Sequence, residues 1–142
     1  MVENADKSAL ILVVNGNIKE LAEMEAKLTE ANYRVITTIN GYEGYEIAVD
    51  QHPDLIMLAD SAKKMSGAKL ARLLKFDKKY SDIPIIAIVA GDTANEEIQA
   101  EIQKLKINRF VTRPIDYKQL LLSIRNLFSE SEIGGFIEEA LL

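Results

Sequence analysis

Five short apolar runs of strand length alternate along the chain with segments that repeat apolar residues at helical spacing. The runs are ALILVV (9–14), ANYRVITTI (31–39), DLIMLA (54–59), IPIIAIVA (83–90) and RFVTRP (109–114). The runs 9–14, 54–59 and 83–90 are apolar at nearly every position, which is typical of strands buried on both faces, as in a parallel sheet. Because parallel neighbours are joined by crossover connections, this order predicts a five-stranded parallel sheet with helices on both faces.

The segments between and after the runs predict five helices. They cover Ile18 to Leu28, 40–52, 67–77, 93–106 and 116–128, and Asp116 is the expected N-cap of the last one. The helical spacing predicts these core-facing residues: Ile18, Leu21, Ala22, Met24, Ala26, Leu28, Tyr45, Ala48, Val49, Leu70, Leu73, Leu74, Ile98, Ile102, Leu105, Tyr117, Leu120, Ile124, Leu127 and Phe128. Residues 8–129 are expected to form the domain, 1–7 an N-terminal tail, and 130–142 a tail or the start of a linker with a possible short helix.

Composition narrows the function classes. The net charge is -5 and no basic stripe stands out, so direct nucleic-acid binding is not favoured. The chain has no cysteine, which excludes disulfides, a thiol nucleophile and Cys-ligated metals. Its apolar runs are far shorter than the roughly 20 residues that span a bilayer, and residues 1–9 lack the apolar core of a signal peptide. We therefore expect a cytoplasmic protein with no direct membrane contact.

Ligands of open parallel sheets bind at the carboxyl ends of the strands. The segments expected at that edge are 15–17, 38–41, 59–65, 89–93 and 112–114. One of them, Asn15-Gly16-Asn17, matches neither G-x-G-x-x-G nor G-x-x-x-x-G-K-[ST], so it predicts a plain turn and no phosphate loop.

Four segments, ILVVNGN, PDLIMLADSAKKMSG, IPIIAIVAGDT and FVTRPID, together resemble the receiver domain of two-component response regulators over about residues 8–128. The resemblance implies a flavodoxin-like (βα)5 sandwich with sheet order 2-1-3-4-5. It also implies a site in which a strand-end aspartate takes a phosphoryl group from a histidine kinase. In that family an acidic pair holds Mg²⁺, and a hydroxyl residue and a lysine contact the phosphoryl oxygens.

In this sequence each of those positions carries a different residue. The acidic pair falls on Asn15 and Gly16, the acceptor on Ala59, the hydroxyl on Val89 and the lysine on Arg113. A methyl group cannot attack phosphorus, and one amide oxygen is a poor substitute for two carboxylates at Mg²⁺. A valine cannot donate a hydrogen bond, and a planar guanidinium does not replace a lysine ammonium. We therefore expect no metal, no cofactor and no enzymatic activity.

Two alternatives stay open. Asp60 follows Ala59 and is a possible displaced acceptor, although strand alternation turns neighbouring side chains to opposite faces unless a bulge intervenes. An exposed carboxylate, or an ion pair with Arg113, is the favoured interpretation of Asp60. The second alternative is a flavodoxin-like binder of a small anion or nucleotide, with Arg113 as its anchor.

The resemblance also implies a partner surface on the fourth helix, fifth strand and fifth helix. Its candidate residues are Gln99, Gln103, Phe110, Leu121, Leu122 and Asn126, and Phe110 keeps the aromatic character of the family's switch residue. An apolar patch there would serve a protein partner or self-association, or would be covered by residues 136–142 of the same chain. The sequence thus predicts a pseudo-receiver, a phosphorylation-independent protein–protein interaction module of bacterial or archaeal signal transduction.

Overall fold

The computed structural model describes the backbone of residues 8–62, 64–90, 103–105 and 107–141, and side chains as far as residue 129. A five-stranded parallel sheet forms its centre, with strand order β2-β1-β3-β4-β5. The strands are β1 (Leu10–Val14), β2 (Arg34–Thr38), β3 (Leu55–Ala59), β4 (Ile85–Val89) and β5 (Arg109–Thr112). Every residue of β1 and β3 is buried, as their apolar runs predict, and the predicted fold is confirmed.

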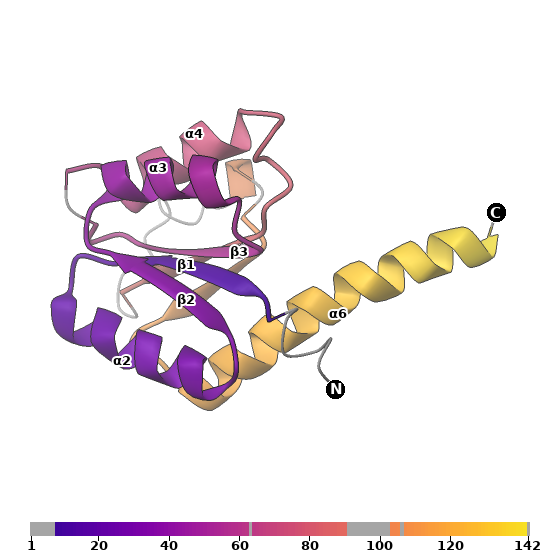
Figure 1. The fold of residues 1–142 in the computed structure, drawn as a ribbon, viewed down its shortest axis with the longest axis horizontal. Coiled ribbons are helices and arrows are strands. Elements are labelled where there is room, and N and C mark those ends of the chain that lie inside the picture. The colour runs from indigo at the N-terminus through magenta and orange to yellow at the C-terminus, as the bar shows by residue number, and fades with distance from the viewer. Residues whose placement is uncertain (1–7, 63, 91–102, 106, 142) are drawn as a thin grey trace.

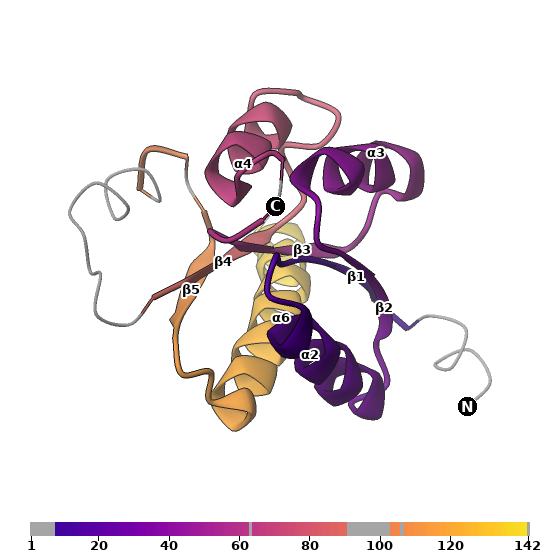
Figure 2. The same cartoon turned by 90° about the vertical axis from the view of Figure 1, so that its left-hand side faces the viewer.

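Helices cover both faces of the sheet. The described helices are α2 (Ile18–Glu30), α3 (Gly41–Gln51), α4 (Gly67–Lys75) and α6 (Tyr117–Leu141). Figures 1 and 2 show α2 and α6 on one face and α3 and α4 on the other. One core cluster joins α2 and α6 to the sheet, and a second joins α3 and α4 to it. The helix predicted over 93–106 lies mostly outside the described residues, as do Ile98, Ile102 and Gln99.

Two boundaries differ clearly from the prediction. Strand β2 begins at Arg34 because Asn32 adopts a left-handed conformation with φ 73°, which asparagine tolerates, and so ends the preceding helix turn. The last helix does not stop near residue 128 but continues to Leu141. No proline interrupts it, and its two glycines weaken a helix without ending it. In Figure 1 the far end of α6 projects away from the sheet.

Five predicted core residues are exposed instead. Three are Ile18, Ala22 and Ala26 on α2, whose buried residues are Leu21, Met24 and Leu28. Val49 on α3 and Leu73 on α4 are 39% and 41% exposed. On α3 the small residues Gly44 and Ala48 face the sheet, and a Cβ added to Gly44 would lie 2.8 Å from Val14 Cγ2. This close approach leaves Val49 at the edge of the interface. On α4 the buried face is formed by Leu70, Ala71 and Leu74, so Leu73 is turned outward.

Candidate functional site at the carboxyl edge of the sheet

The strand register brings the predicted site residues to one edge of the sheet. Val14 pairs with Leu58, and Val89 pairs with Thr112. Asn15 and Arg113 each follow the last residue of a strand, so they lie at the same edge as Ala59 and Val89.

Two of these positions are closed and apolar. Ala59 is 0% exposed and belongs to the core cluster shared with α2 and α6. Val89 is also buried. A methyl and an isopropyl group therefore occupy this part of the edge, and neither carries a nucleophile or a hydrogen-bond donor.

Asn15 is a fully buried polar side chain whose hydrogen-bonding capacity is used within the protein. Its Nδ2 donates to Glu20 Oε1 at 2.7 Å and lies 3.6 Å from Met24 Sδ. Its Oδ1 accepts from the Asn17 backbone N–H at 2.9 Å and from Ser61 Oγ at 3.2 Å. An amide oxygen has two lone pairs, so Asn15 has no further oxygen lone pair to offer a cation. Gly16 contributes no side chain.

Arg113 joins two carboxylates across the edge. Its Nε lies 3.0 Å from both Oε1 and Oε2 of Glu20, and its Nη1 lies 3.3 Å from Asp60 Oδ1. The exposed side-chain fractions are 24% for Arg113, 17% for Glu20 and 44% for Asp60. The predicted Asp60–Arg113 pair is confirmed, and the Glu20 pair is closer and more shielded. We call Asn15, Glu20, Asp60, Ser61 and Arg113 the edge network.

The edge network ties four elements together. Asn15 follows β1, Glu20 lies in the first turn of α2, Asp60 and Ser61 follow β3, and Arg113 follows β5. Asp60 lies in a turn rather than in β3, so strand alternation does not fix its direction. Charge-assisted hydrogen bonds of this kind are about twice as strong as neutral ones, so the network holds the strand ends in one arrangement.

Sequence reasoning missed Glu20. Asn17 caps α2, and its side chain accepts from the Glu20 backbone N–H at 3.0 Å. The spacing Asn-x-x-Glu is that of a capping box. That spacing is a signal that would have placed Glu20 in a helix first turn at the carboxyl edge, although its pairing with Arg113 depends on the fold.

Tyr117 lies beside this network, at the start of α6. Together with Asn17, Lys19, Glu20, Glu23, Pro114 and Ile115 it lines a cavity of about 240 Å³. Burial, followed by the carboxylates of Glu23 and Glu20, raises the pKa of the Tyr117 hydroxyl to about 12. Lys27 Nζ lies 6.0 Å from the centre of its ring. Tyr117 is therefore a neutral hydroxyl at physiological pH.

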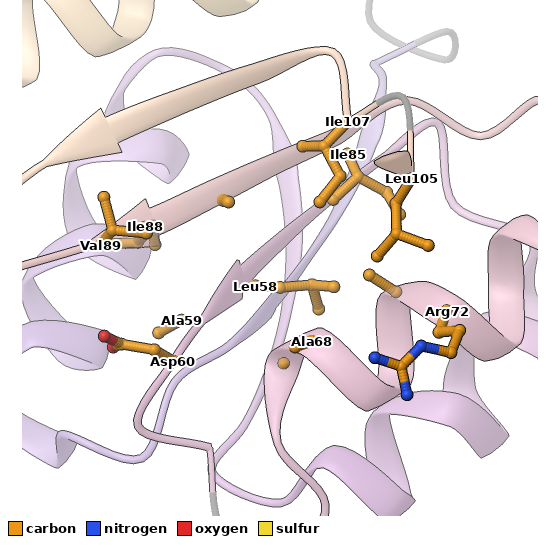
Figure 3. Close-up of a pocket in the computed structure, with 13 residues that line it drawn as sticks. Leu58, Ala59, Asp60, Ala68, Arg72, Ile85, Ile88, Val89, Leu105 and Ile107 are labelled. Atoms are coloured by element: carbon orange, nitrogen blue, oxygen red, sulfur yellow. The ribbon is translucent and has the colours of Figure 1, made fainter. Parts of the chain in front are cut away.

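A larger cavity of about 320 Å³ lies beside α4. Figure 3 shows its mainly apolar lining, which includes Leu58, Ile85 and Leu105, with Asp60 and Arg72 at different sides. Ala59 and Val89, at the carboxyl edge of the sheet, also line this cavity. Within the residues that the structure describes, no group of three or more His, Cys, Asp or Glu side chains is placed to hold a metal ion.

Among the described candidate partner residues, Phe110 and those on α6 do not form one continuous patch. Phe110 is 50% exposed, and its neighbour Val111 packs with the cluster that includes α6. Because strand side chains alternate, Phe110 extends from the opposite face of the sheet. On α6, Leu121 is half-buried against the core, whereas Leu122 and Asn126 are exposed, as is Gln103.

No helix in the described part of the chain is long and apolar enough to cross a membrane.

Comparison with known proteins identifies a matching family and two similar proteins. The model of the family "Response regulator receiver domain" matches residues 11–125. "Response regulator PleD" of Caulobacter vibrioides is 34% identical over 120 residues, which cover 84% of this chain and 26% of that protein. "Hybrid signal transduction histidine kinase D" of Dictyostelium discoideum is 28% identical over 139 residues, 98% of this chain and 9% of that protein. The chain thus spans a minor part of both relatives.

Solved structures agree on the fold. A CheY-like response regulator receiver domain protein from Methanospirillum hungatei superposes with a TM-score of 0.81 at 17% identity, covering 90% of this chain and 99% of that one. Chemotaxis response regulator CheY4 of Vibrio cholerae gives 0.76 at 22% identity, covering 84% and 98%. On its sheet order and on these matches, the chain belongs to the response regulator receiver domain family.

Proposed function

We propose that this receiver domain is a pseudo-receiver, which acts as a protein–protein interaction module without being phosphorylated. The observation that carries the proposal is the state of the carboxyl edge. The resemblance puts the family's acceptor aspartate at Ala59, whose methyl group is buried, and Arg113 and Glu20 bind each other across the edge at 3.0 Å.

The chemistry of phosphoryl transfer supports this proposal. Formation of an aspartyl phosphate needs a free carboxylate oxygen as nucleophile and a cation to offset the charge of the transferred group. Asp60, the carboxylate that follows Ala59 in the sequence, is paired with Arg113 at 3.3 Å. The positions of the metal-binding acidic pair hold Asn15, whose amide oxygen already accepts two hydrogen bonds, and Gly16. The residues present therefore do not fit a Mg²⁺ site.

The same pairing argues against an anion-binding role. An anion bound to Arg113 through Nε would have to displace Glu20, which is 17% exposed and holds Nε through both oxygens. Displacement would leave a largely buried carboxylate without its cation, which is costly. An anion bound through the Nη atoms would lie close to the carboxylates of Glu20 and Asp60 and be repelled by them.

Binding of a protein partner does not require unpaired charged groups at the carboxyl edge of the sheet. We place it on the residues of the candidate partner surface, namely Gln99, Gln103, Phe110, Leu121, Leu122 and Asn126. Support comes from Phe110 and Leu122, two large apolar side chains that are about half exposed. In this proposal the conformation of the surface is set by packing and by the partner.

A phosphodonor experiment tests the proposal. The chain is incubated with acetyl phosphate and MgCl₂, and its intact mass is measured beside that of Asp60→Asn. We expect both masses to stay unchanged. A mass gain of one phosphoryl group that disappears in Asp60→Asn would establish Asp60 as a displaced acceptor and would overturn the proposal.

A further inference from the structure

The outer face of α4 combines cationic and apolar side chains, and none of them belongs to the edge network or to the candidate partner surface. Lys69, Arg72, Leu73 and Phe76 recur at spacings of three and four residues and are all exposed. The opposite face of the helix, formed by Leu70, Ala71 and Leu74, packs against the sheet. Phe76 is 74% exposed, a large apolar surface to leave in water.

Charge is strongly segregated around this face. Residues 64–79 contain six Lys or Arg residues and one Asp, in a chain whose net charge is -5. Lys78 and Lys79 continue the exposed basic surface in the turn after α4. Lys75 differs, because its Nζ bonds to the Ser81 and Ile83 carbonyls at 3.2 and 3.3 Å, and burial lowers its pKa. We call Lys69, Arg72, Leu73, Phe76, Lys78 and Lys79 the basic–apolar face.

The complement of this face is present in the same sequence. Residues 129–142, SESEIGGFIEEALL, contain four Glu and no Lys or Arg, interspersed with large apolar residues. The backbone of this stretch is the end of α6 as far as Leu141. Figure 1 shows that end of α6 projecting away from its own domain and from α4. The two complementary segments are thus held apart within one molecule.

We propose that the basic–apolar face is a self-association surface, which binds the acidic end of α6 of a second copy of this chain. Opposite charges would steer the contact, and Leu73 and Phe76 would supply the apolar area at its centre. A net negative chain does not favour an anionic bilayer or nucleic acid as the occupant. Two copies can make this contact reciprocally in a two-fold dimer, or successive copies can repeat it in rings and open assemblies. It is independent of the proposed phosphorylation-free function.

The test uses the full chain and charge reversal on either side of the contact. Variant one is Lys69→Glu with Lys79→Glu, and variant two is Glu138→Lys with Glu139→Lys. The matched control is Lys118→Glu, an exposed lysine on α6 outside both segments. Far-UV circular dichroism and thermal melting show whether each variant is folded. Sedimentation velocity gives the assembly state over a range of protein concentrations and at two salt concentrations.

We expect the wild type and Lys118→Glu to associate in a concentration-dependent way, with average mass at least about twofold above the monomer's. Association should weaken from 0.1 M to 1 M salt, since the Debye length falls from about 10 Å to about 3 Å. Each double-charge variant alone should be monomeric. An equimolar mixture should associate again, because variant one retains the acidic end of α6 and variant two retains the basic–apolar face.

Three outcomes would overturn the proposal. One is a wild type that stays monomeric at every concentration. Another is that variant one is folded and still associates as the wild type does. That result would assign self-association to a different surface, for example one that contains Phe110 and Leu122. The third is a monomeric wild type that binds vesicles of anionic lipid through α4, which would make the occupant a membrane.

Discussion

The Glu20–Arg113 pair makes a quantitative prediction about the stability of the domain. In Arg113→Met, the carboxylate of Glu20 keeps the Asn15 amide as its hydrogen-bond partner at 2.7 Å but loses its cation. Breaking a buried ion pair costs about 3–5 kcal/mol, and an exposed one costs about 0–1 kcal/mol. With exposed fractions of 24% and 17%, this pair lies between those limits. We expect a loss of about 2 kcal/mol, or about 6 °C in melting temperature.

A double-mutant cycle separates the pair from the rest of each side chain. Arg113→Met, Glu20→Gln and their combination are compared by urea denaturation, and we expect a coupling free energy of about 1–2 kcal/mol. The matched cycle pairs Arg113→Met with Asp60→Asn, whose single contact is 3.3 Å long and more exposed. We expect less than about 0.5 kcal/mol for it. A Glu20 coupling no larger than the Asp60 coupling would refute the claim that Glu20 and Arg113 hold the edge.

Further predictions concern the packing, the acceptor position and the pH dependence. Gly67→Ala should destabilise the domain by about 1–3 kcal/mol, because its Cβ would lie 2.6 Å from the Ala59 carbonyl oxygen; Ala68→Ser, an exposed neighbour, should change stability by less than about 0.5 kcal/mol. Ala59→Asp should cost about 1–3 kcal/mol through burial of a polar group, and its melting temperature should not rise with millimolar Mg²⁺; a clear rise would show that a metal site persists. The folded chain keeps the Tyr117 hydroxyl protonated up to about pH 12, whereas the unfolded chain ionises it near the ordinary value of 10.0. The free energy of unfolding should therefore be unaffected by Tyr117 below about pH 10 and should fall between about pH 10 and 12. Tyr117→Phe should reduce that fall in denaturation measured across this range, and an unchanged pH profile would contradict the assignment.

The sheet was predictable because its signal is local and strong. Runs such as 9–14 and 83–90 are apolar at almost every position, and burial on both faces of a parallel strand requires that pattern. The start of β2 was not predictable to the residue, because Asn32 leaves the helix through a left-handed conformation rather than through an apolar boundary. The exposure of Val49 and Leu73 was also missed, since glycine and alanine on a helix compete with larger residues for the face that approaches the sheet most closely.

The absence of the phosphoryl-site groups could be predicted from the sequence. The ion pairs and hydrogen bonds that occupy the edge instead were harder to predict. The sequence alone shows that Ala59 and Val89 lack the groups of a phosphoryl site, and it suggested the Asp60–Arg113 pair. It did not suggest Glu20, which lies 93 residues before Arg113 and meets it only after four elements have packed. The saturation of the Asn15 amide likewise depends on Ser61, which is brought close by the pairing of β1 with β3.

The central claim is that the carboxyl edge is held by the protein's own ion pair and does not respond to a phosphodonor. The most direct measurement is the ¹H–¹⁵N NMR spectrum of the chain, including the Arg113 Nε–H signal, before and after addition of Mg²⁺ and acetyl phosphate. We expect a resolved Arg113 Nε–H signal, lost in Glu20→Gln, and no shift of the backbone amides of residues 15, 60 and 113 on addition. An Arg113 signal that is indifferent to Glu20→Gln, together with amides at this edge that shift with Mg²⁺ and phosphodonor, would contradict the account.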